Sequence, residues 1–518
     1  MDHSLFSEFA GRAAKWSGSF AIAAVIFIVF HSMVSYFKLR HIPGPPIAAF
    51  TNVVRRAWVG RGDLHEKHTR LHRKYGTVVR VGPRAVLISQ PKAIEKIYGF
   101  KAKFLKSEFY DSIIPRIKGG KIPDVFATRD EDLHRQMRKP IANLYSIANL
   151  ISFEPLVFST MRCFFSRLDE LFTDKNKDFD LGQWLQLFTF DVMGEVTFSR
   201  RLGFLEKGGD IENVMENNWQ YFQAAAPNTQ MPWLDYFWKD NPLLPTVSKR
   251  NPLADFGAAR IKERLDMTEK ERSSINQRDF LSCFIEEAHK NPGLPKLALP
   301  TWTNSNIQAG GDTTAIMASV ILYYLLKNPS TLDVLQREID KAAHEGRISE
   351  FVTWKESQTL PYLDACVKEA SRLHPPIGFP LERIVPESGL QVDGYHIPPG
   401  TRVSMNPWAV HREISLYGDG AEIWKPERWM CSEMEKKAMY HSLLTFGAGH
   451  RVCLGKNLSY FEVYKLVPSL LQKYQLELVD PQREWSLETK WFTMPSGFRV
   501  RIKSRNSTKR NPDNPNIG

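Results

Sequence analysis

The stretch Phe446-Gly447-Ala448-Gly449-His450-Arg451-Val452-Cys453-Leu454-Gly455 decides how this 518-residue chain is interpreted. An apolar stretch that we predict to be helical, Leu458 to Leu471, follows it. Cys453 therefore precedes a helix, where backbone N–H groups and the helix dipole stabilise a thiolate. The glycines allow tight turns and the close approach of a flat ligand. Arg451 could bind a carboxylate of that ligand, and Phe446 could keep water from the sulfur.

Taken alone, a cysteine in a glycine-rich turn is most often a buried core residue. This loop, however, resembles the ligand loop of the cytochrome P-450 superfamily, Phe-x-x-Gly-x-Arg-x-Cys-x-Gly, and matches it at every specified position. The resemblance implies that haem b (iron protoporphyrin IX) binds here, with Cys453 as the axial ligand of the iron. It also implies that Arg451, Phe446 and Gly455 contact the haem. His450 is not expected to bind the iron, because the pattern places sulfur there.

Two further motifs lie in the order of that family. Glu369-Ala370-Ser371-Arg372 matches its Glu-x-x-Arg, and the i, i+3 spacing lets the two charges pair on a predicted helix, Pro361 to Leu373. Pro426-Glu427-Arg428-Trp429 resembles its Pro-Glu-Arg-Phe segment, with Trp429 in place of Phe. Alone, the Glu-x-x-Arg spacing would be interpreted as a solvated helix face. The resemblance implies a structural triad that supports folding and haem retention: Glu369, Arg372 and Arg428.

A long helical run, from about Thr301 to Leu326, contains Ala309-Gly310-Gly311-Asp312-Thr313-Thr314. Each glycine weakens a helix by about 1 kcal/mol relative to alanine, so the segment predicts either a distorted turn or a flexible kink. It matches the oxygen-activation motif of the same family. The resemblance implies a distorted turn above the iron, in which Thr313 hydrogen-bonds to bound oxygen and Asp312 relays protons from solvent.

Three more residues are candidates for holding the haem propionates. His134 and Arg138 occupy the positions of a Trp-x-x-x-Arg motif common in the family, with His in place of Trp. A capping box of Thr128 and Glu131 would begin the helix that carries them. Arg383 is the third candidate, and a surface salt bridge is the alternative for each of the three. Apolar residues, which suit a lipophilic small molecule, are expected to line the substrate pocket: Ala309, Ile377, Phe379 and Met494.

An N-terminal membrane anchor is predicted for residues 17–37, which contain no Asp, Glu, Lys or Arg. As a helix with about 1.5 Å per residue, the segment would just cross a hydrocarbon core of roughly 30 Å. Lys38, Arg40 and His41 follow, so the positive-inside rule places the body of the protein in the cytosol. A cleaved signal peptide is the alternative, although no small-x-small cleavage site follows the apolar run. We therefore expect a single-pass protein of the endoplasmic reticulum membrane.

The remainder of the chain predicts a single mostly helical domain. Strands are predicted at Thr77–Val81 and Ala85–Ser89, over short stretches between Leu381 and Val403, and at Gly497–Ile502. The expected fold class is mainly α with small β-sheets, the cytochrome P-450 fold, preceded by one transmembrane helix. The expected division is a lumenal tail (1–16), the anchor (17–37), a basic and Pro-rich hinge (38–46), a haem-thiolate catalytic domain (47–503) and a disordered tail (504–518).

The charge and the cysteines narrow the choice of partners and compartment. The net charge is +12, from 69 basic and 57 acidic residues, which favours anionic partners. No zinc-spaced Cys and His and no aromatic RNA-binding signature accompany it. We therefore expect a membrane surface or an acidic redox partner rather than nucleic acid. Five widely spaced cysteines do not form a disulfide framework, which suits a reducing compartment.

The resemblance implies a monooxygenase that inserts one oxygen atom of O2 into a lipophilic small molecule with electrons from NADPH. It implies an NADPH-cytochrome reductase (FAD/FMN) as electron donor, with cytochrome b5 as a second candidate. The continuation Gly455-Lys456-Asn457-Leu458-Ser459-Tyr460-Phe461-Glu462 is similar to filamentous-fungal members near pisatin demethylase, which suggests secondary metabolism.

Two other functions compete with this interpretation. The first is a haem-thiolate isomerase or dehydratase that needs no external electrons, which the Asp312-Thr313 pair disfavours. The second is a haem sensor or carrier without turnover, which the basic charge and the complete oxygen motif disfavour.

Overall fold

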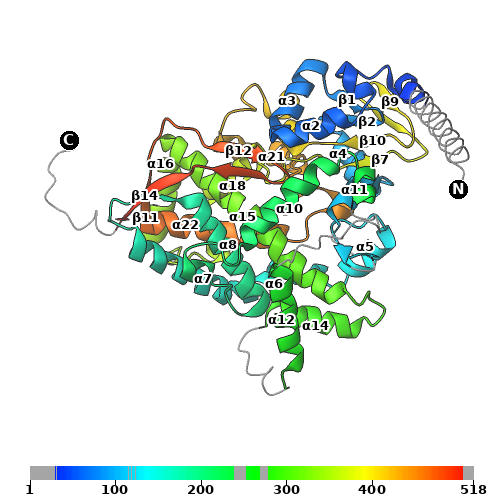
Figure 1. Cartoon of the computed structure of the whole chain (residues 1–518). Coiled ribbons are helices and arrows are strands. Elements are labelled where there is room, and N and C mark those ends of the chain that lie inside the picture. The colour runs from blue at the N-terminus through cyan, green and yellow to red at the C-terminus, as the bar shows by residue number, and fades with distance from the viewer. Residues whose placement is uncertain are drawn as a thin grey trace, which may run out of the picture.

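The computed structural model describes residues 30, 32–114, 116, 117, 120–122, 124–238, 252–268 and 278–505. Figure 1 shows a mostly helical body with small sheets, which confirms the predicted fold class of the body. Most of the predicted anchor at 17–37 and of the tail at 504–518 lies outside the described residues. Within that anchor, residues 32–37 are described and are helical.

The central element is α15 (Ala298–Lys327), which packs along α8 (Leu181–Phe198) and also contacts α18 (Pro361–Leu373) and α22 (Lys456–Lys473). Its bounds agree closely with the predicted run from Thr301 to Leu326. Among the described helices it alone is long and apolar enough to cross a membrane, but most of it is buried inside the protein. It is therefore the core helix of the fold.

The glycine pair of the central helix has a packing cause. A Cβ at Gly310 would lie 2.4 Å from Met193 Sδ, and one at Gly311 would lie 2.7 Å from Phe190 Cζ. Both neighbours belong to α8, so only glycine permits the close approach of the two helices. α15 runs without interruption through the pair. The glycine pair therefore causes no break in the helix.

The main sheet brings distant segments together. Its strand order is β1 (Val78–Gly82), β2 (Ala85–Ile88), β10 (Arg402–Ser404), β7 (Arg383–Ile384) and β3 (Leu105–Lys106). β2 pairs in parallel with β10, and β7 pairs antiparallel with both β10 and β3. The predicted hairpin at 77–89 is present as β1 and β2. In the β3–β7 register, Lys106 lies directly opposite Arg383, so two cations share one pairing position.

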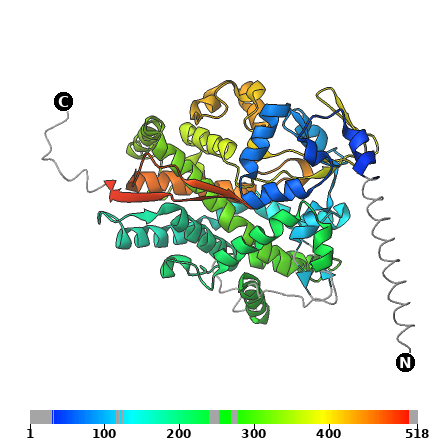
Figure 2. The ribbon, with the colours of Figure 1, turned by 45° about the horizontal axis from the view of Figure 1, so that its top comes forward.

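The other strands form small sheets. β11 (Tyr474–Leu478), β14 (Arg499–Ser504) and β6 (Phe179–Asp180) make a three-stranded sheet. Hairpins are formed by β12 (Ser486–Thr489) with β13 (Thr493–Ser496), β8 (Leu390–Val392) with β9 (Tyr395–Ile397), and β4 (Arg116–Ile117) with β5 (Gly120–Lys121). The last strand begins two residues later than predicted. Figures 1 and 2 both show β11 and β14 on the opposite side of the molecule from the N-terminal helices (blue). The β12–β13 hairpin instead reaches these helices, because the N–H of Thr489 donates to the carbonyl of Gly62 at 2.7 Å.

The remaining helices surround α15. They are α2 (Val53–Arg61), α3 (Leu64–Tyr75), α4 (Ala93–Tyr98), α5 (Glu131–Arg138), α6 (Ile147–Leu150), α7 (Glu154–Leu171), α9 (Phe204–Lys207), α10 (Val214–Asn228), α11 (Trp233–Trp238), α12 (Pro252–Asp266), α14 (Phe280–Lys290), α16 (Pro329–His344), α17 (Trp354–Ser357), α19 (Pro407–Val410), α20 (Ile414–Tyr417) and α21 (Glu433–His441). Short 3-10 helices lie at Pro46–Ala49, Glu108–Ile113, Ala142–Tyr145, Ile151–Phe153, Pro426–Met430 and Gly449–Arg451.

The N-terminal cap of α5 differs from the prediction. The cap is Asp130, whose Oδ1 accepts hydrogen bonds from the backbone N–H groups of Asp132 (2.9 Å) and Leu133 (3.0 Å). Thr128 instead accepts from the N–H of Asp130 at 3.3 Å. The predicted capping box at Thr128 and Glu131 is therefore wrong, because a carboxylate two residues later satisfies the free N–H groups.

Buried histidines make the stability of the fold sensitive to acid. Burial lowers the pKa of His65 to about 4 and the pKa of His374 and His411 to about 3. Between the unfolded pKa near 6.5 and these folded values, the unfolded chain binds more protons. Each such histidine therefore lowers the free energy of unfolding by about 1.4 kcal/mol for every unit by which the pH falls within that window.

We predict that the unfolding free energy of His374→Gln falls less steeply between pH 6.5 and pH 4.5 than that of the wild type. The difference in slope should correspond to about one proton fewer taken up on unfolding. Urea unfolding at several pH values measures this slope. The exposed His344 is the matched control, and His344→Gln should leave the slope unchanged. Buried carboxyls such as Asp312 contribute with the opposite sign, so the comparison of variants isolates the histidine. Equal slopes in wild type and His374→Gln would contradict the prediction.

Candidate active site

The cysteine loop is fixed by its backbone. The N–H of Cys453 donates to the carbonyl of Phe446 at 2.8 Å, which closes the loop. A Cβ at Gly449 would lie 1.8 Å from the carbonyl oxygen of Tyr98, and Gly449 has a φ of 63°, so this position requires glycine. Gly455 is the N-cap of α22, which confirms the predicted helix after the cysteine. The sulfur therefore lies at the start of a long helix.

The Cys453 thiol faces an internal space. Its side chain is exposed, yet desolvation by the surrounding protein raises its pKa. Hydrogen bonds from the backbone N–H groups of Gly455 and Lys456, and the charge of Arg138, act in the opposite direction. A thiol in this position is neutral by itself, whereas a coordinated metal cation would hold it as the thiolate. The donor set thus suits a metal bound through sulfur.

One face of α15 also borders an open space. Ala309 is exposed and Thr313 is partly exposed, although Asp312 and Thr314 on either side of Thr313 are buried. Ala309 and Thr313 share a face at the i, i+4 spacing, and the Thr313 hydroxyl donates to the Ala309 carbonyl at 2.6 Å. Thr314 donates to Ser459 Oγ of α22 at 3.1 Å. This bond ties the oxygen-activation motif to the helix that begins at the cysteine loop.

Buried cations gather beside the loop. Burial lowers the pKa of Lys106 well below its ordinary value, and the nearby charges of Arg383 and Arg451 lower it further. Arg383 donates to the Tyr110 hydroxyl at 3.0 Å. Arg451 pairs with Glu131 at 2.7 Å, but its buried Nε has no hydrogen-bond partner among the described residues. The cluster holds more buried positive charge than its own contacts balance, which fits the two propionates of a haem.

Helix α5 presents its predicted residues to the same region. The Arg138 side chain makes no hydrogen bond or ion pair among the described residues, and burial lowers its pKa although the nearby charge of Cys453 acts in the opposite direction. His134 is buried, its Nδ1 lies 3.9 Å from Glu131 Oε2, and burial lowers its pKa to about 3. His134 is therefore a neutral ring that can donate one hydrogen bond. Both residues line a cleft of about 660 Å³ together with His450.

The structure brings the expected triad together. Glu369 accepts from Arg372 Nη2 at 2.8 Å and Nε at 2.9 Å, and from Arg428 Nε at 3.0 Å. Arg372 also donates to the carbonyls of His411 (2.7 Å) and Ala421 (2.6 Å). Glu369 and Arg372 have no exposed side-chain surface. The two arginines thereby fasten α18 to the chain segment that precedes the cysteine loop.

Trp429 adds a contact that the sequence did not indicate. Its indole N–H donates to Glu369 Oε2 at 2.9 Å, and the N–H of Lys425 donates to Oε1 at 3.0 Å. The exchange of Phe for Trp in the motif therefore adds a hydrogen bond to the buried carboxylate. Nothing in the spacing of the motif reveals this bond, because it depends on the rotamer of one ring.

Asp312 points away from Thr313 and toward two other helices. Its Oδ1 accepts from Gln186 Nε2 of α8 and its Oδ2 from Asn218 Nδ2 of α10, both at 2.6 Å. Burial raises its pKa to about 6, and the two amides act in the opposite direction. Gln186 and Asn218 could not be found from the sequence, because they lie far from the motif along the chain.

The expected pocket residues divide into two groups. Ile377 forms a bridge with Phe492, Phe379 packs on Trp491 with ring centroids 5.5 Å apart, and Met494 lies on β13 beside them. Ala309 lies separately on α15. Phe379 of the first group belongs to an aromatic cluster from five segments of the chain: Phe109, Tyr110, Phe126, Phe222, Phe379, Trp491 and Phe492.

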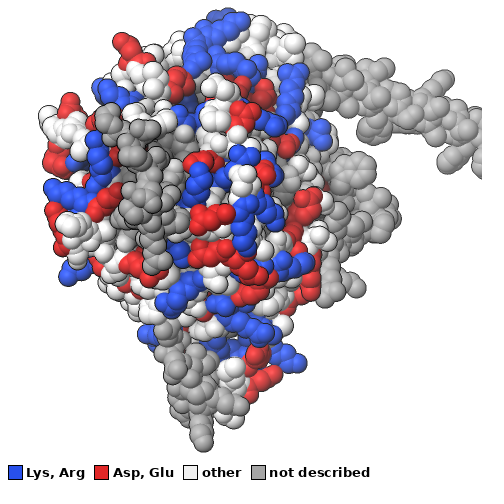
Figure 3. All heavy atoms as spheres, turned by 90° about the vertical axis from the view of Figure 1, so that its left-hand side faces the viewer, with Lys and Arg blue, Asp and Glu red and all other residues white. Residues whose placement is uncertain are grey.

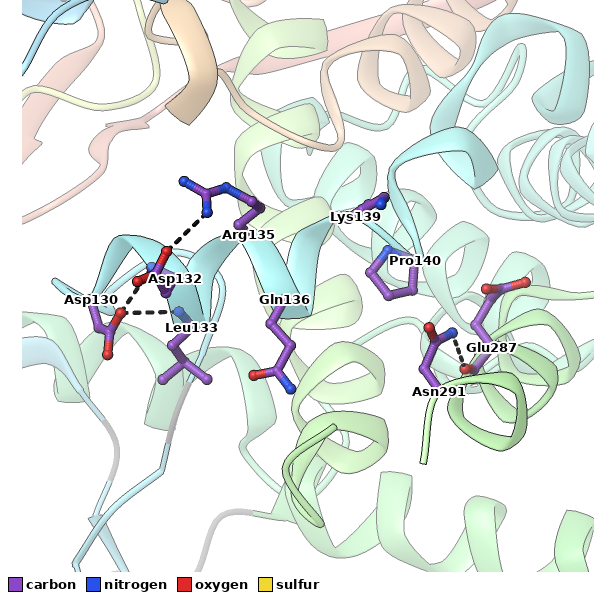
Figure 4. A pocket seen from close by; sticks show the side chains of 9 residues that line it. All are labelled: Asp130, Asp132, Leu133, Arg135, Gln136, Lys139, Pro140, Glu287 and Asn291. Carbon is purple, nitrogen blue, oxygen red and sulfur yellow. Dashed lines mark hydrogen bonds and ion pairs between the residues drawn. The ribbon is translucent and has the colours of Figure 1, made fainter. Parts of the chain in front are cut away.

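A larger open cleft, of about 910 Å³, adjoins the first one, and Arg135 and Lys139 line both. Figure 4 shows its lining side chains, which come from α5, its flanking residues and the end of α14. These side chains carry charges of both signs, and Arg135 pairs with Asp132 at 2.9 Å across part of the rim. The cleft contains none of the residues of the cysteine loop, the triad or the oxygen-activation motif. We therefore place the chemistry at Cys453.

Comparison with known proteins gives a consistent result. The family model described as Cytochrome P450 matches residues 42–501. "Cytochrome P450 monooxygenase cicH" of Emericella nidulans is 58% identical over 489 residues, which cover 94% of this chain and 98% of that protein. A "Cytochrome P450 monooxygenase" of Aspergillus terreus is 46% identical, covering 88% and 94%. "Cytochrome P450 monooxygenase mpaDE" of Penicillium brevicompactum is 40% identical, covering 93% of this chain and 57% of that protein.

Proposed function

The chain belongs to the cytochrome P450 family and is a haem-thiolate monooxygenase; from this premise we propose its finer function. It inserts one oxygen atom of O2 into a lipophilic small organic molecule, with electrons from NADPH that a flavoprotein reductase delivers. The observation that carries the proposal is the Cys453 loop, in which a desolvated thiol receives backbone N–H groups at the start of α22.

The haem would be held by residues of four segments: the cysteine loop, α5, β3 and β7. Cys453 would bind the iron, and Phe446 and Gly455 would lie beside the ring. Bound in this way, a thiolate-ligated haem supplies dioxygen activation, which electron donation from the sulfur favours. The cations of the site would hold the propionates: Arg451, Arg383, Arg138 and Lys106, with His134 as a neutral donor.

The chain's own residues would place the substrate and move protons. The apolar face at Ala309 and the residues Ile377, Phe379 and Met494 would exclude water and orient the substrate. Asp312 would take up protons from solvent. Thr313, whose hydroxyl is already held by the Ala309 carbonyl, would direct them into the site. Such a positioned proton donor typically accelerates a reaction by about 100-fold or more.

Thr313→Ala tests this assignment. We predict an intact haem spectrum but a fall of about tenfold or more in product formed per NADPH, because protons would no longer be directed to the site. Product and hydrogen peroxide are measured together during NADPH oxidation with a reductase. The matched control is Thr303→Ala, which removes the same hydroxyl bond to the carbonyl four residues earlier on the same helix. Full coupling in Thr313→Ala would contradict the assignment, and product without NADPH would favour an isomerase or dehydratase.

The proposal includes a membrane anchor and redox partners. We place residues 1–16 in the lumen, an anchor at 17–37, a hinge at 38–46 and the catalytic domain at 47–503, on the cytosolic side of the endoplasmic reticulum membrane. Large apolar residues at the end of the proposed anchor are exposed, which supports contact with lipid: Phe30, Met33, Val34, Tyr36 and Phe37. Flotation of the full chain with microsomes, compared with residues 47–518, tests the anchor.

NADPH-cytochrome reductase would be the main electron donor, with cytochrome b5 as a second donor. The face drawn in Figure 3 carries Lys, Arg, Asp and Glu side by side, so the net charge of +12 is not gathered there. The fungal sources of the similar monooxygenases support a role in secondary metabolism. The metabolites lost in a deletion strain would identify the substrate.

A further inference from the structure

The carboxylate of Asp312 is held from two sides by neutral amides. Gln186 on α8 donates to one oxygen and Asn218 on α10 donates to the other, each at 2.6 Å. Asp312 is 2% exposed and Asn218 is also buried, whereas Gln186 is partly exposed. Thr313, the neighbour to which the acid would pass protons, donates its own hydroxyl to Ala309 instead. The acid thus faces the seam between α8 and α10.

We propose that Gln186 and Asn218 are positioning residues that form an amide clamp for the proton-relay acid. The clamp holds the carboxylate at the α8–α10 seam, where Gln186 reaches partly exposed surface. There the carboxylate takes up one proton from solvent, and it then releases one proton toward Thr313, so that it ends ionised again. The inference deepens the proposed function and rests on the role assigned to Asp312.

The neutral charge of the clamp explains why amides occupy these positions. An arginine or lysine in either place would hold the acid ionised, so it could not be reloaded with a proton near neutral pH. Two amide donors order the carboxylate without adding charge, and its pKa stays raised to about 6 by burial. Among the described residues, the charged group that acts on Asp312 is Asp210, in the segment before α10, which also favours the protonated form. The acid can therefore exchange protons in the physiological range.

The helix contacts show that the clamp has a fixed frame. Thr189, one turn after Gln186 on α8, donates to the carbonyl of Gly311 at 2.9 Å. The glycine pair brings α8 close to α15 at this level. Asn218 reaches the same carboxylate from α10, a separate element. The Asp312 carboxylate is therefore oriented by α8 and α10, two helices other than α15, which carries it.

Infrared titration of the haem-loaded protein tests the clamp directly. The carboxylic acid C=O band of Asp312, identified by its loss in Asp312→Asn, should titrate near pH 6 in the wild type. Gln186→Leu and Asn218→Leu should each raise this pKa by about one or more, because a hydrogen bond to the charged form is lost. Gln186→Lys should lower it. The matched controls are Gln183→Leu on α8 and Asn217→Leu on α10, both exposed neighbours of the same residue type, which should leave it unchanged.

The turnover of the same variants gives a second readout. Product formed per NADPH should fall several-fold in the two leucine variants and in Gln186→Lys. Its pH profile should move toward alkaline pH in the leucine variants and toward acid pH in Gln186→Lys. An unchanged Asp312 pKa in both leucine variants, or full coupling in all three, would overturn the clamp while leaving the monooxygenase assignment intact. If the wild type makes no NADPH-dependent product, the proposed function fails, and the infrared titration still decides whether the clamp exists.

Discussion

Cys453→Ala is expected to abolish the haem-thiolate spectrum completely. The thiol is the metal donor that we propose, at the start of α22. His450 is the closest alternative in the sequence, but its Nε2 lies 3.2 Å from Glu131 Oε2, where the carboxylate holds it. The purified variant, supplied with haem, should show no absorption band typical of sulfur ligation and no monooxygenase activity.

The control for this experiment is another cysteine of the same chain. Cys431 is partly exposed and belongs to a side cluster of the core, so Cys431→Ala should keep the thiolate spectrum. Retention of that spectrum by Cys453→Ala, with its loss in Cys431→Ala, would show that the sulfur ligand had been assigned to the wrong residue.

Glu369→Ala is expected to destabilise the whole domain. It would leave Arg372, a cation with no exposed surface, without its carboxylate, and it would remove the partner of Arg428 and Trp429 as well. Removing one partner of a buried ion pair typically costs about 3–5 kcal/mol. Whole domains are stable by only about 5–15 kcal/mol. The variant should therefore show a large drop in its unfolding midpoint and retain little haem.

Thermal unfolding and the ratio of haem to protein measure both effects. An exposed pair with the same i, i+3 spacing serves as the control, because Lys436 Nζ lies 2.7 Å from Glu433 Oε1 on α21. Glu433→Ala should leave the midpoint and the haem content unchanged, since solvent screens an exposed pair. A midpoint in Glu369→Ala equal to that of Glu433→Ala would contradict a structural role for the triad.

The parts of the site that depend on short sequence patterns could be predicted. The cysteine loop could be recognised from its spacing. The backbone has positive φ angles at 447 and 449, which favour glycine at these fixed positions before Cys453. The bounds of α18 follow from Pro361 at its start and Pro375-Pro376 after its end. Glu369 and Arg372 lie on one helix, so their pairing follows from helical spacing alone.

The parts of the site that depend on tertiary contacts could not be predicted from the sequence. Lys106 lies opposite Arg383 only because β3 and β7, far apart in the chain, pair in one register. Gln186 and Asn218 converge on Asp312 from two other helices. Lys106, Gln186 and Asn218 look like ordinary surface residues in the sequence.

Even a motif that was found did not reveal what its glycines contact. The two glycines of the central helix indicated a distorted turn, whereas their observed role is to admit Phe190 and Met193 of α8. A glycine in a helix can indicate either close packing against a neighbouring element or an unusual backbone conformation. The sequence does not distinguish these two causes. Only the packing partner does.

The bond between the sulfur of Cys453 and a haem iron is tested most directly with the wild-type protein. The purified full chain, loaded with haem, is reduced under carbon monoxide and its absorption difference spectrum is recorded. The account predicts a strong Soret band at the position characteristic of thiolate ligation, in proportion to the haem bound. A haem-loaded protein that shows only the band typical of nitrogen ligation, or no band, would contradict it.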